Sequence, residues 1–184
     1  LHHKVQASPV NLNINFKTDG IKSIQGDLSC SALDLAIHPG EKECSLKIKR
    51  LKGSVDLNEN KLIFTLDELK LDYPKMDVIG RLAFTPSSSS TPRKIDLEIT
   101  GTNVDVPSTR AVALELFGKS PVVLDIFKII KGGKVPAINY TNHASSLADL
   151  GSLENMTLHG GILDGKIFVP GVALDIEGVE GNVT

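Results

Sequence analysis

The sequence has few of the residues with which proteins bind nucleic acids. Tryptophan is absent, aromatic residues make up 4% of the 184 residues, and the formal net charge is −2. Nucleic-acid-binding proteins usually carry a basic surface patch, and those that bind single strands add aromatic side chains on which bases stack. We therefore expect no nucleic-acid partner.

The sequence also lacks a long apolar run. A transmembrane helix needs about 20 consecutive apolar residues, and a signal peptide needs a shorter apolar region near its start. Neither occurs, and the chain begins with Leu1, His2 and His3 rather than with methionine. We expect it to be a piece of a longer protein, from which targeting segments have been removed.

Cysteine is scarce, with only Cys30 and Cys44 in the chain. If the flanking segments pair as a hairpin that turns at residues 38–41, Cys30 lies about nine residues before the turn and Cys44 about four after it. The two would then not face each other, and a disulfide requires close Cα atoms. We expect two small buried hydrophobic residues, with a disulfide as the alternative.

Catalytic and metal-binding signatures are missing as well. The five histidines have no spacing typical of metal ligands, and no nucleophile elbow of the form Gly-x-Ser-x-Gly occurs. Residues 117–120 look like the end of a phosphate-binding loop, but Ala113 stands where that motif requires glycine. We expect no enzyme activity, no cofactor and no metal site. A hydrolase with an unrecognised site is the remaining enzymatic alternative.

What the sequence does have is alternation of apolar and polar residues. Val10, Leu12, Ile14 and Phe16 alternate with polar residues, and similar runs recur over residues 24–37, 44–57, 62–71, 76–84, 95–99 and 156–183. A period of two indicates strands with one apolar face. The parity changes within the runs near residues 32, 50 and 68, which predicts a bulge or break at each point.

Two helices interrupt the strands. Residues 108–117 form the first, with Ser108 as its expected N-cap and Gly118 as its stop. Residues 121–131 form the second, which starts at Pro121 after Ser120 and is ended by the glycines at 132 and 133. Its only polar residues form a narrow stripe, so we expect it to be covered on several sides and to act as the plug of the fold.

The predicted fold is therefore mostly β. A long curved antiparallel sheet folds over into a groove or half-barrel, and a short helical pair packs against it. Residues 1–184 form a single domain, with a β-meander at 1–106, the helical pair at 107–133 and a second β-meander at 134–184.

The two helices are too small to cover the apolar face of this sheet. Ten strands at a spacing of about 4.8 Å make a sheet roughly 45 Å wide, whereas one helix is about 10 Å across. Either the sheet closes into a sandwich or barrel, or part of its apolar face stays open as a groove. Ten side chains are expected to line such a groove: Leu46, Ile48, Val55, Leu62, Phe64, Val78, Leu82, Ile95, Leu97 and Phe127.

The strand rhythm and glycine placement of residues 146–162 and 165–170, and of the apolar helix at 121–132 followed by Lys134, Val135 and Pro136, resemble the AsmA-like family of Gram-negative envelope proteins. The resemblance covers roughly residues 50–184. It implies a folded-over β groove with an apolar interior, implicated in phospholipid transport and outer-membrane assembly. It also implies a periplasmic location, with an inner-membrane anchor in the full-length protein that this sequence lacks. The family offers no catalytic residues.

Two functional hypotheses follow. The first is a non-enzymatic lipid-binding or lipid-conducting β-groove module whose partner is a phospholipid or another acyl lipid. The second is a closed-core structural or protein-interaction domain of an envelope protein. Such a domain would stack on neighbouring β repeats of the same chain or on other envelope proteins through an open terminal strand at 179–184, because unpaired strand edges attract partners.

Overall fold

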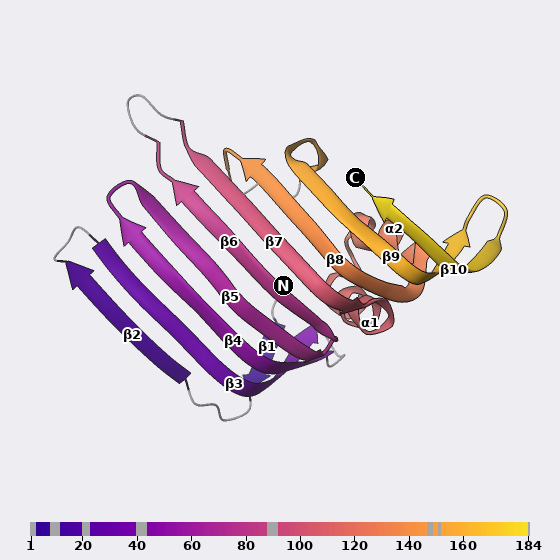
Figure 1. Cartoon of the computed structure of the whole chain (residues 1–184), viewed down its shortest axis with the longest axis horizontal. Helices are drawn as coiled ribbons and strands as arrows, with labels where there is room; N and C mark the ends of the chain where they lie inside the picture. The colour runs from indigo at the N-terminus through magenta and orange to yellow at the C-terminus, as the bar shows by residue number, and fades with distance from the viewer. Residues whose placement is uncertain are drawn as a thin grey trace.

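The computed structural model describes residues 3–7, 12–19, 23–39, 44–87, 92–146, 149–150 and 152–183. In this part of the chain, ten strands form one antiparallel sheet (Figure 1). The strands are β1 (His3–Ala7), β2 (Leu12–Asp19), β3 (Ser23–Pro39), β4 (Cys44–Asn58), β5 (Lys61–Tyr73), β6 (Met76–Thr85), β7 (Lys94–Asp105), β8 (Ile130–Ala144), β9 (Met156–Val169) and β10 (Leu174–Val183).

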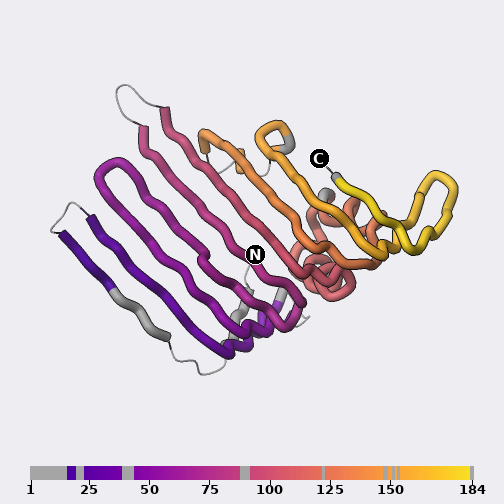
Figure 2. The backbone as a smooth tube through the Cα atoms, in the orientation of Figure 1, coloured from indigo at the N-terminus to yellow at the C-terminus, as the bar shows by residue number. Residues whose placement is uncertain are grey.

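The strands follow one another in the sheet almost in sequence order. The path runs from β1 through β3 to β10, and β2 pairs with β3 beside it. The 17-residue β3 has room for both partners, because β2 pairs with residues 23–30 and β1 with residues 35–39. The backbone trace passes from strand to strand as a meander (Figure 2).

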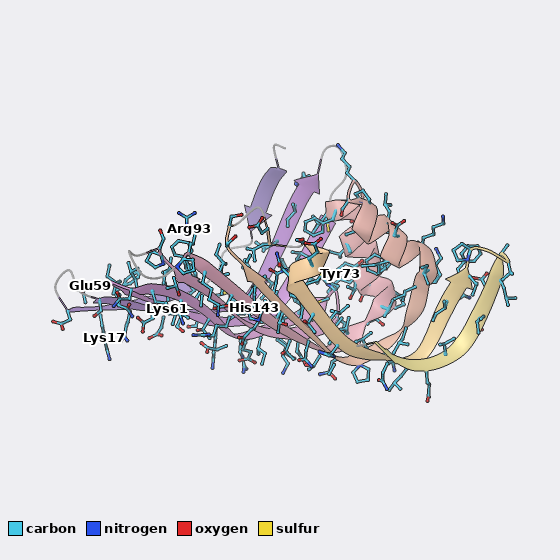
Figure 3. The ribbon with its side chains drawn as sticks, turned by 90° about the horizontal axis from the view of Figure 1, so that it is seen from above. Lys17, Glu59, Lys61, Tyr73, Arg93 and His143 are labelled. Atoms are coloured by element: carbon cyan, nitrogen blue, oxygen red, sulfur yellow. The ribbon has the colours of Figure 1, made fainter. Side chains whose placement is uncertain are left out.

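The sheet is curled but not closed. Its two helices, α1 (Val106–Phe117) and α2 (Pro121–Ile129), lie on one side of it, and the strands rise on both flanks of the helices (Figure 3). Away from the helices the sheet continues as a flatter region, which includes Lys17, Glu59 and Lys61. This confirms the predicted fold class: a mostly β, curled antiparallel sheet with a short helical pair packed against it.

The expected parity changes coincide with irregularities in the strands. Ala32 in β3 has a φ of 55°, and the pairing between β3 and β4 skips Ala32 and Lys49. The register between β5 and its neighbours shifts at the step from Lys52 to Gly53 and between Leu66 and Leu69. An irregularity that inserts or skips one residue returns the next apolar side chain to the same face. These breaks keep one face apolar along the whole length of the strands.

Helix α1 begins two residues earlier than expected, and its N-cap is Asp105 rather than Ser108. The Asp105 carboxylate accepts a hydrogen bond from the backbone N–H of Ser108 at 2.9 Å. The cap is set by where β7 ends, since Asp105 is the last residue with extended backbone before the helix. The Ser108 hydroxyl instead donates to the Asp105 carbonyl and accepts from the backbone N–H of Lys75.

The prediction that the second helix forms the central plug is wrong. Helix α2 begins at Pro121 as expected, but none of its described side chains is buried, and Leu124, Ile126 and Ile129 are 46%, 44% and 42% exposed. The buried helical side chains, Val106 and Val112, come from α1. With nine residues α2 rests on α1, β8 and β9 by one side only. Nor do the glycines end it, because strand β8 already starts at Ile130 and includes them.

We predict that Asp105→Ala lowers the free energy of unfolding by about 1 kcal/mol at neutral pH, which is typical for the loss of an N-cap. The hydrogen bond from Ser108 holds the pKa of Asp105 below its ordinary value of 3.8. The contribution of the charge is therefore complete above that value and is lost as the pH falls through the lower pKa of the folded state. Urea melts of both proteins at pH 7 and near pH 3 measure this. Equal losses at the two pH values would contradict it.

We also predict different costs for two large apolar side chains. Ile95→Ala removes a side chain that is 1% exposed and should cost about 2–5 kcal/mol. Phe127→Ala removes only a half-buried ring of α2 and should cost less than about 2 kcal/mol, because water already reaches part of it. Urea melts compare the two variants directly. A larger loss for Phe127→Ala would restore α2 as the plug.

Candidate functional site

One row of side chains crosses six strands on the apolar face of the sheet. Cross-strand pairing aligns Phe16 with Gly26, Gly26 with Val55, Val55 with Phe64, Phe64 with Leu82 and Leu82 with Leu97. Directly opposite residues in an antiparallel sheet point to the same face, with Cβ atoms about 5 Å apart. The pairing therefore builds a continuous apolar strip at right angles to the strands.

A second row runs beside the first. In it Leu28 pairs with Gly53, Gly53 with Leu66, Leu66 with Gly80 and Gly80 with Ile99. Large side chains thus alternate with glycines. At Gly53 an added Cβ would lie 2.8 Å from the carbonyl oxygen of Thr65, so a larger residue cannot enter without moving backbone. Because glycine has no side chain, backbone atoms form the surface of the sheet between these large side chains.

The two rows line an open pocket of about 540 Å³. Its walls are the side chains of Phe16, Leu28, Leu51, Val55, Phe64, Leu66, Leu82, Leu97 and Ile99, with Gly26, Gly53 and Gly80 between them. The polar lining residues Asp27, Ser54, Thr65 and Arg81 pair with one another across the strands and belong to the opposite face. They reach the pocket only through backbone atoms, so the pocket surface is apolar.

The pocket is on the helix-bearing face but outside the area that the helices cover. Cys44 of β4 is completely buried and contacts Glu115 of α1, and Cys44 shares its face with Ile48. Ile48 pairs with Leu71, and Leu71 pairs with Met76. Met76 and the pocket residue Leu82 are six residues apart on β6, so their side chains point to the same face of the sheet. The helices therefore close one end of this face and leave the other end open.

Several pocket side chains are unusually accessible for their size. Phe16 is 68% exposed, Phe64 47%, Ile99 37% and Leu28 36%. Contiguous exposed apolar surface of this kind is rare on monomeric proteins and marks a binding site. The arrangement can bind an elongated apolar ligand, because it offers a row of hydrocarbon contacts and few polar groups.

Four of the ten expected groove residues line this pocket: Val55, Phe64, Leu82 and Leu97. Leu62 and Val78 are half-buried on the same face beside it. Ile48 and Ile95 are buried, at 8% and 1% exposure, and Leu46 is half-buried near Cys44. Phe127 belongs to α2 and is not among the lining residues.

The sequence reasoning missed other members of the pocket, chiefly Phe16, Leu28, Leu66 and Ile99. Leu66 and Ile99 have the same parity as the predicted residues of their own runs, whereas Phe16 and Leu28 belong to apolar runs from which no groove residue was predicted. A pairing register anchored on the glycines would have found them, because Gly26, Gly53 and Gly80 recur next to large residues on neighbouring strands.

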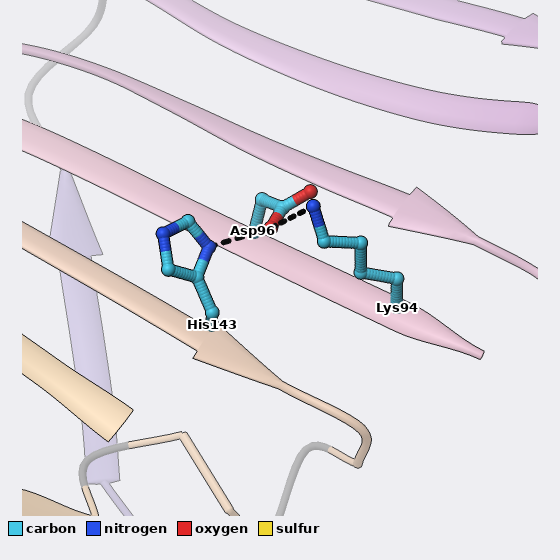
Figure 4. Close-up of polar contacts among 3 residues, drawn as sticks. All are labelled: Lys94, Asp96 and His143. Atoms are coloured by element: carbon cyan, nitrogen blue, oxygen red, sulfur yellow. Dashed lines mark hydrogen bonds and ion pairs between the residues drawn. The ribbon is translucent and has the colours of Figure 1, made fainter. Parts of the chain in front are cut away.

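A cluster of charged side chains is on the opposite face, at the β7–β8 pair (Figure 4). The Asp96 carboxylate lies 2.7 Å from Nδ1 of His143 and 3.0 Å from Nζ of Lys94. Partial burial alone would raise the pKa of Asp96, but the hydrogen bonds from His143 and Lys94 outweigh it, so the pKa lies below its ordinary value. His143 and Lys94 are 61% and 60% exposed, and neither lines the apolar pocket. We interpret it as a surface ion-pair network.

The cysteines carry no reactive site. Both are free and buried, which confirms the expectation of two small hydrophobic residues. Burial, together with a hydrogen bond to Glu115, raises the pKa of the Cys44 thiol to about 11. Since the thiolate is the nucleophilic form, Cys44 is inert at neutral pH. The described residues also contain no cluster of side chains able to hold a metal ion.

Comparison with known protein families, curated proteins and solved structures found no match. Within the described ranges, neither helix reaches the length and apolar character needed to cross a bilayer.

We predict that Asp96→Asn lowers the free energy of unfolding by less than about 1 kcal/mol at pH 7, because its partners are exposed. The pKa of Asp96 is depressed in the folded state, so its contribution is present above the ordinary pKa of 3.8 and is lost as the pH falls through the lower value. Thermal melts from pH 7 to pH 3 should therefore converge for the two proteins at acid pH. A difference that grows towards acid pH would contradict this assignment.

Proposed function

We propose that this protein is a non-enzymatic lipid-binding or lipid-conducting β-groove module of the cell envelope. The observation that carries the proposal is the open apolar pocket on the part of the sheet that the helices leave uncovered. Its partner is a phospholipid or another acyl lipid. Each acyl CH₂ that leaves water contributes about 0.8 kcal/mol to binding.

The dimensions of the apolar strip suit an acyl chain. Its first row crosses six strands, from β2 to β7, which at about 4.8 Å per step is a length of roughly 24 Å. The acyl chains of one leaflet occupy about half of a hydrocarbon core that is about 30 Å thick, or roughly 15 Å. An extended chain therefore fits across the strands, and its headgroup reaches solvent at the pocket's open side.

The wider setting follows from the sequence resemblance. An AsmA-like protein would place this module in the periplasm, anchored to the inner membrane in its full-length form, with a role in phospholipid transport or outer-membrane assembly. Supporting that setting, an unclosed curled sheet with a one-sided apolar surface is the shape that a lipid groove needs.

A specific observation also favours a second candidate, a structural or protein-interaction domain of an envelope protein. In the described part of the chain, β10 has a strand partner only on its β9 side, and Leu174 and Ile176 on it are 51% and 40% exposed. A strand of a neighbouring β repeat or of another envelope protein would extend the sheet there by backbone hydrogen bonds. The sequence analysis expected such a domain to have a closed core. That part of the prediction is wrong, because the sheet is unclosed.

We predict that Phe64→Asp strongly weakens lipid binding without unfolding the protein. The substitution places a carboxylate in the apolar pocket at a position that is already 47% exposed. Titration of a fluorescent phospholipid should show binding at least tenfold weaker than for the wild type, and mass spectrometry should find less co-purified lipid.

Ile79→Asp is the matched control. Ile79 is 51% exposed on the next strand, β6, but it pairs with Thr100 on the opposite face of the sheet. This variant should bind lipid like the wild type. Equal losses in both variants, or no lipid binding by the wild type, would refute the proposal.

A further inference from the structure

Both rows of pocket side chains lead to a polar residue on the next strand, β8. Leu97 of the first row pairs with Asn142, and Ile99 of the second row pairs with Tyr140. Directly opposite residues point to the same face of a sheet, so Asn142 and Tyr140 lie on the apolar face beside the pocket wall. From β2 to β7 the two rows consist of apolar side chains and glycines, so this pair is a polar break in the pattern.

The two polar side chains are joined by a hydrogen bond. Nδ2 of Asn142 donates to the hydroxyl oxygen of Tyr140 at 3.3 Å. Among the described residues this is the one hydrogen bond of the Tyr140 hydroxyl, and in it the hydroxyl is the acceptor. A phenolic hydroxyl can also donate, so its hydrogen is left for an acceptor outside the protein. Tyr140 is half-buried, so part of its side chain is accessible to such an acceptor.

Asn142 occupies a position where an apolar residue would be more stable. It is 0% exposed, and its Oδ1 atom has no hydrogen-bond partner among the described residues. A buried polar atom without a partner lowers stability, and residues that do so are expected mainly at functional sites. The hydrogen bond that the Asn142 side chain does make goes to Tyr140. Holding the Tyr140 hydroxyl is therefore the role that its contacts indicate.

We propose that the Tyr140 hydroxyl binds the polar end of the lipid, by donating a hydrogen bond to the carbonyl oxygen of its acyl group. Asn142 is a positioning residue, because its bond to the Tyr140 oxygen restricts where the hydroxyl hydrogen can point. This inference rests on the proposed lipid-binding function and adds the contact that orients the lipid. The acyl carbonyl is the bonded group because it is an acceptor directly attached to the hydrocarbon chain.

The charges around the pocket favour a carbonyl over a headgroup phosphate. Phosphates in proteins are usually bound by arginine or lysine. Among the described lining residues Arg81 has the one cationic side chain, and it pairs with Glu98 and Thr65 on the opposite face of the sheet. A neutral donor such as the Tyr140 hydroxyl suits a neutral acceptor.

The position of Tyr140 also gives the path of the acyl chain. The acyl chains of one leaflet are roughly 15 Å long, which equals about three steps of 4.8 Å between strands. Counted from β8, three steps pass Leu97 of β7 and Leu82 of β6 and reach Phe64 of β5. The lipid therefore lies with its carbonyl at Tyr140 and its chain end near Phe64.

A matched pair of lipids tests the hydrogen bond. Ester-linked phosphatidylcholine has acyl carbonyls, whereas ether-linked phosphatidylcholine with the same chain lengths and headgroup has none. Competition of each with a fluorescent phospholipid gives the two affinities. We expect the wild type to bind the ester lipid about two- to tenfold more tightly than the ether lipid, which is the range for one neutral hydrogen bond.

Tyr140→Phe removes the hydroxyl and keeps the ring. This variant should bind the ester and ether lipids equally, with an affinity for the ether lipid like that of the wild type, which also shows that it is folded. Tyr73→Phe is the matched control, because Tyr73 is the other tyrosine of the chain and is not among the lining residues. It should keep the preference for the ester lipid.

Asn142→Leu tests the positioning role. It removes the unpartnered oxygen, so the free energy of unfolding should stay the same or rise. The preference for the ester lipid should nevertheless fall, because the Tyr140 hydroxyl is no longer held. A purely structural asparagine would not change this preference, and an unchanged preference would remove Asn142 from the proposal.

A spectroscopic measurement reports the hydrogen bond directly. The Tyr73→Phe variant contains Tyr140 as its single tyrosine and has no tryptophan, so the tyrosine absorption band reports on Tyr140 alone. Donation of a hydrogen bond by a phenol shifts this band to longer wavelength. The ester lipid should produce the shift and the ether lipid should not.

Free palmitate distinguishes the two sources of an acyl carbonyl. If Tyr140→Phe weakens the binding of both palmitate and the ester lipid, the hydroxyl recognises carboxyl and ester groups alike. A loss for palmitate alone would assign the contact to fatty acids. Equal affinities of the wild type for the ester and ether lipids and no loss of palmitate binding in Tyr140→Phe would together overturn the inference and leave lipid binding intact. If the wild type binds none of these lipids, the proposed function itself is refuted.

Discussion

Backbone pairing in a single antiparallel sheet is the interaction on which this structure depends. Every strand from β3 to β9 has partners on both sides, so the ladder is continuous across the molecule. By contrast, only eight apolar side chains of the described residues are buried as a core, and three of them, Cys44, Val106 and Val112, lie where α1 meets the sheet or begins. Backbone hydrogen bonds between the strands therefore hold the sheet together where other side chains cover only one of its faces or neither face.

This construction has a consequence for the surface. A sheet that is apolar on one face normally buries that face against another layer. Here the cover is a pair of short helices at one end, and the irregularities near Ala32, Lys52 and Leu66 keep apolar residues on the same face beyond them. The exposed pocket is the part of that face left over. Its glycines shape it, because they remove side chains from alternate positions of a row that would otherwise be filled.

The pocket wall is built from apolar side chains and glycines, and the polar residues of the same strands point to the opposite face of the sheet. This surface chemistry suits the hydrocarbon part of a lipid.

The sequence by itself determined most of the strands, the identity of the apolar face and the places where its parity changes, because these depend on a period of two that is visible along the chain. It also located the start of α2, since Pro121 acts within its own turn. It did not identify β1 or the start of β8 at Ile130. The cap of α1 was missed because it depends on where β7 ends, and that boundary is set by pairing with β8.

Burial was decided only by the tertiary structure. Ile95 and Phe64 have the same strand pattern, yet one is 1% exposed and the other 47%. Likewise α2 is apolar enough for a core but lies at the surface, and Phe127 with it. The physical reason is that alternation is a local property, whereas burial depends on which distant segment lies over a given part of the sheet. In this protein the helices cover only part of the apolar face.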